Sequence, residues 1–196
     1  MDYVERRRKA AVAGHRGDAA TARALLDDAD AGVRATALGA LARAGALQAA
    51  DLQRALADVD AGVRRRACEE AVGIEQVDLL PSLADADPSV VEAAAWALGE
   101  RGPSAAGAVD ELVSVARQHD DPLCREAAVA ALGAIGDPRG LPTVLAAASG
   151  DRPTVRRRAV VALAAFDGPD VDAALRAALE DRDWQVRQAA EDLLDE

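Results

Sequence analysis

A helix-length motif recurs six times along this chain and limits what it can fold into. Its clearest copy runs from Asp121 to Gly136. We number each copy from its arginine as position zero. The zero positions are Arg34, Arg64, Val91, Arg125, Arg156 and Arg187, so the copies follow one another at intervals of 27 to 34 residues. Such a period is typical of stacked supersecondary units, and the chain is therefore predicted to be a repeat array.

Each copy has the pattern of a capped amphipathic helix. Apolar residues at positions −1, +3, +4 and +7 form one stripe of an α-helix, and position +3 is alanine in all six copies. Five copies place an aspartate at position −4, where an N-cap belongs, and proline follows it in Asp87-Pro88 and Asp121-Pro122. A shorter apolar run precedes each motif, so each repeat is predicted to contain two helices. In the last copy Glu191 replaces the apolar residue at position +4, as suits a terminal repeat.

The motif Asp-x-x-Val-Arg-x-x-Ala-x-x-x-Leu-Gly resembles the HEAT repeat, in the short form found in phycobilisome-lyase-type proteins. The resemblance covers about residues 18–194 and departs at Val91 and Arg152, which stand where arginine and aspartate are expected. It implies an all-α fold: a right-handed α-solenoid of six two-helix HEAT-like repeats plus an N-terminal cap helix. We expect one domain over residues 1–196. Its predicted parts are a cap helix at 2–13 and repeats at about 18–44, 46–73, 75–101, 103–136, 138–166 and 169–194.

Composition narrows the possible functions. The formal net charge is −11, which argues against nonspecific nucleic-acid binding because such binding depends on neutralising phosphates. No apolar segment approaches membrane-spanning length, and no apolar stretch follows the basic run near the start. Two cysteines in such a chain suggest a reducing compartment. We therefore expect a cytoplasmic protein without a membrane partner.

The sequence contains no recognisable catalytic or metal-binding motif. The two histidines, His15 and His119, lie far apart in predicted loops, and no Cys/His cluster has metal-ligand spacing. HEAT-type iron hydroxylases carry paired His-Glu dipeptides. In this chain His15 precedes Arg16 and His119 precedes Asp120, so the resemblance to those hydroxylases fails at the metal ligands. No glycine-rich phosphate loop is present in the sequence. We expect no enzymatic activity, no metal and no cofactor.

The recurring aspartates and arginines have two readings. The resemblance implies that they form a structural ladder linking successive units, while the alternative is a charged recognition row. Recurrence in every unit favours the ladder, because a binding site needs only one place. The predicted ladder residues are Asp30, Arg34, Asp60, Arg64, Asp87, Asp121, Arg125, Arg156, Asp183 and Arg187.

Positions +1 and +5 lie opposite the apolar stripe, and the resemblance implies that the second helices line a concave groove. The candidate partner-binding residues are Trp96, Glu92, Glu100, Arg65, Glu69, Glu126, Arg157 and Val161. Trp96 has the character of an interface anchor, but it could instead pack onto the neighbouring helix. Trp184 is expected to pack against the fifth repeat.

These observations favour a non-catalytic interaction scaffold that binds an unidentified protein or peptide in its concave groove. One alternative is an accessory factor of an enzyme, such as a bilin-lyase-like chaperone. A chromophore pocket usually needs several aromatics, and this chain has two Trp, one Tyr and one Phe. A DNA-binding or glycosylase-like HEAT protein is a third possibility that the acidic charge disfavours.

Overall fold

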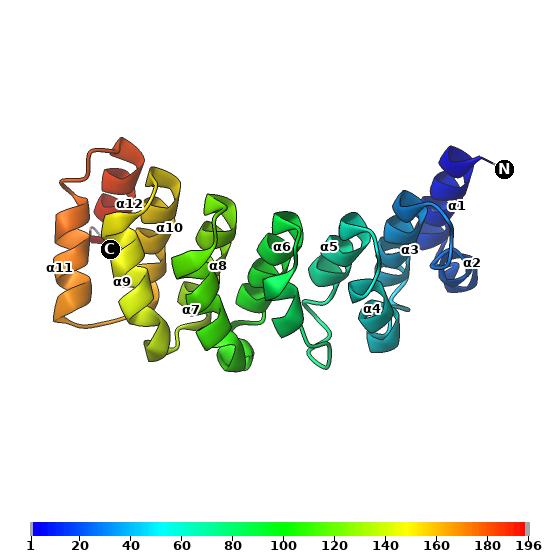
Figure 1. The fold of residues 1–196 in the computed structure, drawn as a ribbon, viewed down its shortest axis with the longest axis horizontal. Coiled ribbons are helices and arrows are strands. Elements are labelled where there is room, and N and C mark those ends of the chain that lie inside the picture. The colour runs from blue at the N-terminus through cyan, green and yellow to red at the C-terminus, as the bar shows by residue number, and fades with distance from the viewer. Residues whose placement is uncertain (1, 195–196) are drawn as a thin grey trace. The chain divides into compact units, whose positions relative to one another are not determined.

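The structure, a computed structural model, describes residues 2–194 and is all-helical. Within this range it contains twelve α-helices and no strand, and successive helices form pairs (Figure 1). None of the described helices is both long and apolar enough to cross a membrane. The predicted all-α repeat architecture is confirmed.

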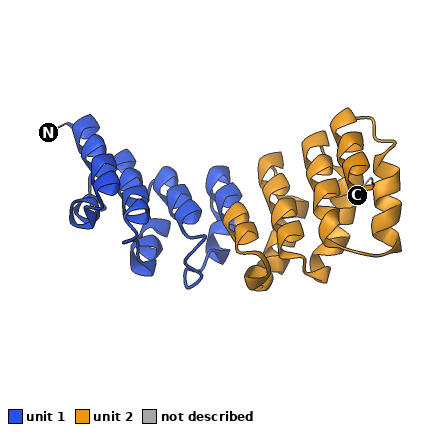
Figure 2. Ribbon diagram, turned by 180° about the vertical axis from the view of Figure 1, so that it is seen from behind, with its two compact units in different colours: residues 1–94 blue, residues 95–196 orange. Residues whose placement is uncertain are grey.

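The chain divides into two compact units, residues 1–94 and 95–196 (Figure 2). The division falls inside helix α6 (Pro88–Glu100). The single domain expected over the whole chain therefore stays a prediction, and each unit is described on its own.

In unit 1 the second helices of successive repeats pack against one another, α1 on α3 and α3 on α5, while α2 packs on α1 and α3, and α4 packs on α5. The bounds are α1 Tyr3–Arg16, α2 Ala19–Ala24, α3 Ala31–Arg43, α4 Ala49–Leu56 and α5 Ala61–Glu70.

The third repeat departs from the predicted pair of helices. In place of the predicted first helix, the structure has a 3-10 segment, η1 (Leu80–Ala84), with Pro81 in its first turn. Proline has no backbone N–H to donate and clashes with the preceding turn, so a short segment starting at Pro81 replaces a longer helix running through it.

Unit 2 has the same two rows. The second helices α8, α10 and α12 pack in one row, and the first helices α7, α9 and α11 pack in the other. The bounds are α7 Val109–Gln118, α8 Pro122–Ile135, α9 Leu141–Gly150, α10 Pro153–Ala162, α11 Pro169–Ala178 and α12 Trp184–Leu194. Three 3-10 segments connect them, namely η2 Gly102–Ala108, η3 Pro138–Gly140 and η4 Leu163–Ala165.

Small residues set how closely the second helices approach. The alanine at position +3 has no exposed surface in any of the six repeats. At position +8, Gly133 of α8 faces α10, where an added methyl group would lie 2.9 Å from the Cα atom of Ala162. Gly14 faces Ala40 and Gly99 faces Ala131 in the same way, at 2.7 and 3.0 Å. Close packing of this kind explains a core built from alanine, leucine and valine.

Helix α1 is a further copy of the motif with a polar outer face. Asp2 caps it by accepting from the backbone N–H of Glu5 at 2.8 Å, Gly14 takes position +8, and Gly17 ends it in the left-handed conformation. Positions −1 and +3, which are apolar in the other copies, are the exposed residues Glu5 and Lys9. At these positions the other second helices pack against a first helix, whereas α1 faces solvent. Polar residues suit that environment.

Candidate functional site

Arginines at position zero join successive repeats in a regular way. Arg34 donates from Nε and Nη2 to the two carboxylate oxygens of Asp58, at 2.8 and 2.6 Å, and its Nη1 donates to the main-chain oxygen of Asp28 at 2.9 Å. We call each such arginine–aspartate pair a rung. The five rungs are Arg6–Asp28, Arg34–Asp58, Arg64–Asp85, Arg125–Asp151 and Arg156–Asp181. Two parallel bonds to one carboxylate make a strong and geometrically specific contact.

The acidic side of the ladder differs from the prediction. The aspartates at position −4 (Asp30, Asp60, Asp87, Asp121 and Asp183) instead accept backbone N–H groups at the starts of their own helices, at 2.8–3.2 Å. An N-cap carboxylate is directed toward the first turn of its helix, so it is not available to an arginine of the preceding repeat. The rung aspartates lie one or two residues earlier in the loop, at position −6, or −5 for Asp151.

Each rung also orders the loop that carries it. The Asp28 carboxylate accepts the backbone N–H of Asp30 at 2.9 Å, and the equivalent bond recurs at Asp58, Asp85, Asp151 and Asp181. One aspartate thus receives the arginine of the preceding repeat, holds its own loop, and offers its carbonyl to the arginine of its own repeat.

Arg6 is a rung residue that the sequence reading missed. Its Nε and Nη2 donate to Asp28 at 2.7 and 3.1 Å. The signal was present, since Asp2, Arg6, Gly14 and Gly17 stand at positions −4, 0, +8 and +11, but Glu5 and Lys9 interrupt the apolar pattern.

Arginine bonds lower the pKa values of the rung carboxyls. The bond from Arg6 lowers the pKa of Asp28, and Arg64, Arg125 and Arg156 do the same for Asp85, Asp151 and Asp181. Burial pushes the pKa of Asp58 upward, but the bonds from Arg34 and from the Asp60 N–H outweigh it, and the net shift is downward.

Acid is therefore expected to weaken the rungs. A carboxyl whose folded pKa lies below its unfolded value, near 4, contributes full stability above that unfolded value and loses it as the pH falls through the folded pKa. The urea midpoint should hold between about pH 6 and 8 and fall below about pH 4. Asp181→Asn should make this fall shallower, because one of the shifted groups is gone. An unchanged acid slope in that variant would contradict the assignment.

Between the third and fourth copies of the motif, the sequence has neither the arginine nor the aspartate of a rung. Val91 takes the arginine position of the third copy, and His119 takes the rung-aspartate position of the fourth. The Nδ1 atom of His119 accepts the backbone N–H of Asp121 at 3.1 Å, so the imidazole replaces the aspartate in ordering its own loop. The rung arginine and the rung aspartate are both absent from this step, which contains the division between the units.

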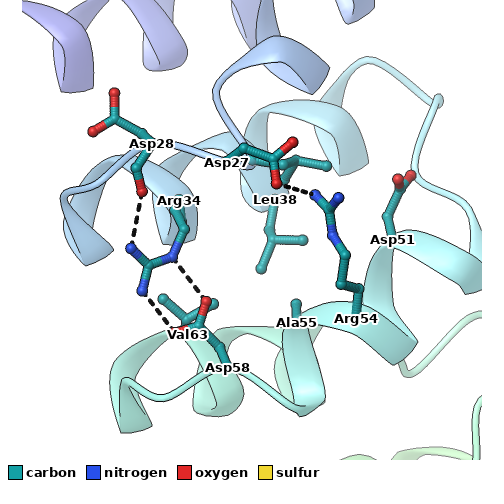
Figure 3. Close-up of a pocket in the computed structure, with 10 residues that line it drawn as sticks. Asp27, Asp28, Arg34, Leu38, Asp51, Arg54, Ala55, Asp58 and Val63 are labelled. Atoms are coloured by element: carbon teal, nitrogen blue, oxygen red, sulfur yellow. Dashed lines mark hydrogen bonds and ion pairs between the residues drawn. The ribbon is translucent and has the colours of Figure 1, made fainter.

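A hollow beside Arg34 in unit 1 is polar but internally paired (Figure 3). Its four aspartates each face an arginine: Asp27 with Arg54, Asp28 with Arg6, Asp51 with Arg23 and Asp58 with Arg34. Across residues 2–194, no group of three His, Cys, Asp or Glu side chains is arranged to hold a metal ion. The hollow is best explained as part of the ladder.

The candidate partner-binding residues of unit 1 are partly engaged with one another. Arg65 and Glu69 form an ion pair at 3.2 Å along α5, and Glu69 also accepts from Arg66 at 3.2 Å. Glu92 of α6 is exposed. These charges form a solvated surface, where such pairs contribute little to stability.

Unit 2 presents the apolar members of the candidate set. The Trp96 and Val161 side chains are 46% and 44% exposed, and both stand at position +5, as does the partly exposed Ala130. Glu100 is exposed, and Glu126 and Arg157 are partly exposed. We call this set, Trp96, Glu100, Glu126, Ala130, Arg157 and Val161, the second-helix face of unit 2. Trp96 is therefore not sealed against a neighbouring helix.

A hollow of about 420 Å³ opens between α8 and α10 on this face. Its walls are alanines, with Gly133, Val161 and Arg158. Arg158 was not among the predicted residues, although it belongs to the triplet Arg156-Arg157-Arg158. Its Nη2 donates to Glu126 at 3.4 Å, and its buried Nε has no hydrogen-bond partner within the described chain.

Comparisons with known proteins agree with the repeat architecture. The family model for HEAT repeats matches residues 77–153 and 109–195, which together cover more than half of the chain. The chain belongs to the HEAT-repeat family. No curated protein matches its sequence.

Solved structures share this architecture. The Escherichia coli protein YibA aligns with a TM-score of 0.71 and 18% identity over 98% of this chain and 82% of its own. A designed armadillo repeat protein in complex with the peptide (KR)4 aligns with a TM-score of 0.66 and 18% identity over 89% of this chain and 97% of its own. The complex of CpcE and CpcF of phycocyanin lyase from Nostoc sp. PCC7120 aligns with a TM-score of 0.64 and 25% identity over 90% of this chain and 75% of that one.

Proposed function

We propose that this protein is a non-catalytic interaction scaffold that binds a protein or peptide on the second-helix face of unit 2. The observation that carries the proposal is the exposure of Trp96 and Val161 at the same motif position, together with the small-residue hollow that Val161 lines. An exposed indole can contribute an apolar anchor, and a hollow lined by alanine and glycine can receive one.

Charge on this face supports a partner with two different ends. Glu100 lies on α6 and Arg157 on α10, whereas Glu126 and Arg158 pair with each other at 3.4 Å. Arg157 would attract an acidic group and Glu100 a basic one, which sets the direction of an extended peptide. In unit 1, the exposed Arg65 and Glu92 and the partly exposed Glu69 are proposed as partner-binding residues of that unit.

Anchor removal is the test of this proposal. Peptides selected from a displayed random library against the intact chain are expected to bind Trp96→Ala and Val161→Ser about ten-fold more weakly each, since an anchor contributes about 1–2 kcal/mol. Binding is measured by fluorescence anisotropy, and circular dichroism checks the fold. Val59→Ser is the control, because Val59 is 95% exposed in a loop of unit 1. Equal affinities for all three variants would refute the site.

A second candidate function is an accessory factor of a bilin lyase, favoured by the 25% identity to the CpcE–CpcF complex. Its test is the absorption spectrum of a free bilin titrated with the chain. An unchanged spectrum would remove this candidate and leave the peptide-binding proposal untouched.

A further inference from the structure

Arg187 of α12 is a ladder arginine whose Nε and Nη2 atoms bind no carboxylate among the residues that the structure describes. Each of the other five arginines holds an aspartate of the next repeat through Nε and Nη2. Among residues 2–194 no carboxylate pairs with Arg187. The donors that bind an aspartate elsewhere in the chain are therefore unused here.

The open guanidinium is already held in the orientation of a rung. Its Nη1 donates to the main-chain oxygen of Asp181 at 2.8 Å. The corresponding bonds of Arg34, Arg64, Arg125 and Arg156 measure 2.9, 2.8, 2.8 and 2.7 Å. A guanidinium group held in this way loses little further conformational entropy when a carboxylate binds, and such preorganisation favours binding.

We propose that Arg187 is the centre of a second binding site, one that takes a carboxylate from an acidic peptide segment of a partner protein. The internal rungs show what the occupant is like: an aspartate in a short loop, reaching the Nε and Nη2 atoms at 2.6–3.1 Å. Trp184 stands three residues earlier on the same helix and is 64% exposed, so it offers an apolar contact beside the carboxylate.

Residues around Arg187 restrict the kind of partner. Glu191, one turn further along α12, is exposed and charged at a position where the other repeats bury an apolar residue. Stacking of a whole helical repeat would bury that charge, which is costly without a partner, so a short segment fits better than a further repeat. The Asp192 carboxylate, which accepts from Gln188 at 2.8 Å, adds to the negative field. The site therefore favours a single acidic group over a run of acids.

A direct test follows the arginine Nε–H signals of the intact chain by NMR. The probe is an acetylated, amidated peptide with the sequence of residues 55–59, which contains the rung aspartate Asp58. We expect the Arg187 signal to shift and to saturate at a peptide concentration about ten-fold below that needed for the exposed Arg182, because only Arg187 is preorganised. The Arg156 signal, already bound to Asp181, should not move.

Two matched changes make the result decisive. The Asp58→Asn version of the peptide should leave the Arg187 signal unchanged. In the Arg187→Lys protein the charge is kept and the fork is lost, so the Trp184 indole N–H should no longer respond to the peptide. The proposal would be overturned if the Arg187 signal did not move, or if the Arg182 signal shifted over the same range of peptide concentration. These outcomes do not bear on the second-helix face, which lies on other helices.

Discussion

Replacing Arg156 with alanine is expected to lower the free energy of unfolding by about 3 kcal/mol, because it removes one partner of a buried ion pair. The Arg156 side chain is 3% exposed and that of Asp181 is 14% exposed. Arg156 donates to both Asp181 oxygens, at 2.8 and 2.7 Å, and to the main-chain oxygen of Asp151 at 2.7 Å. The variant leaves a partly buried carboxylate that keeps the hydrogen bond from the Asp183 N–H.

The chain provides its own control for this experiment. Arg187 makes the same bond to its loop but pairs with no carboxylate in the described chain, so Arg187→Ala should lower stability by less than about 1 kcal/mol. Urea denaturation followed by circular dichroism measures both variants. Equal losses would mean that the arginine contributes through packing or its loop bond, and that the rung itself contributes little.

Gly133→Ala is expected to lower the free energy of unfolding by about 2 kcal/mol, although alanine is the better helix former by about 1 kcal/mol. The added methyl carbon would lie 2.6 Å from the Cβ atom and 2.9 Å from the Cα atom of Ala162. Contacts this short force α8 and α10 apart, because a main-chain atom cannot rotate away.

Two further variants isolate the cause of that loss. Gly150, the last residue of α9, has no neighbour within 4 Å of an added methyl group, so Gly150→Ala should be neutral or slightly stabilising. Adding Ala162→Gly to Gly133→Ala should recover part of the lost stability, since one of the two clashing atoms is removed. Urea midpoints provide the measurement, and a destabilised Gly150→Ala variant would point instead to a general effect on helix ends.

The helical repeats could be predicted because their signals are local. The aspartate at position −4, the alanine at +3 and the glycine at +8 each act within one helix or against the adjacent one, and they recur in phase. The pairing across repeats was harder to predict, because two aspartates recur in most loops, as in Asp58 and Asp60. An aspartate that caps its own helix has already committed its carboxylate, which leaves the earlier one for the arginine.

The repeat pattern did not predict the exposure of the two tryptophans. Trp184 was expected to pack against the fifth repeat, yet it is 64% exposed, because it is the first residue of α12, at the edge of the helix row. Trp96 stands at position +5, opposite the apolar stripe, where a large aromatic side chain can either remain exposed or fold onto a neighbouring helix. Its 46% exposure depends on how neighbouring helices are spaced, which a single sequence does not specify.

Four of the five rung aspartates, all but Asp85, also accept an arginine of their own repeat through the carbonyl, and this double use limits where the chain can change in length. Asp58 receives Arg34 through its side chain and Arg64 through its carbonyl, so the residues between Asp58 and Arg64 must keep their number for both bonds to form. That spacing is six residues in each rung loop except the one at Asp151, where it is five, whereas whole repeats differ by up to seven. Insertions and deletions should therefore be tolerated in connections that carry no rung residue, such as Gly102–Ala108, and selected against in the short loops that precede the rung arginines.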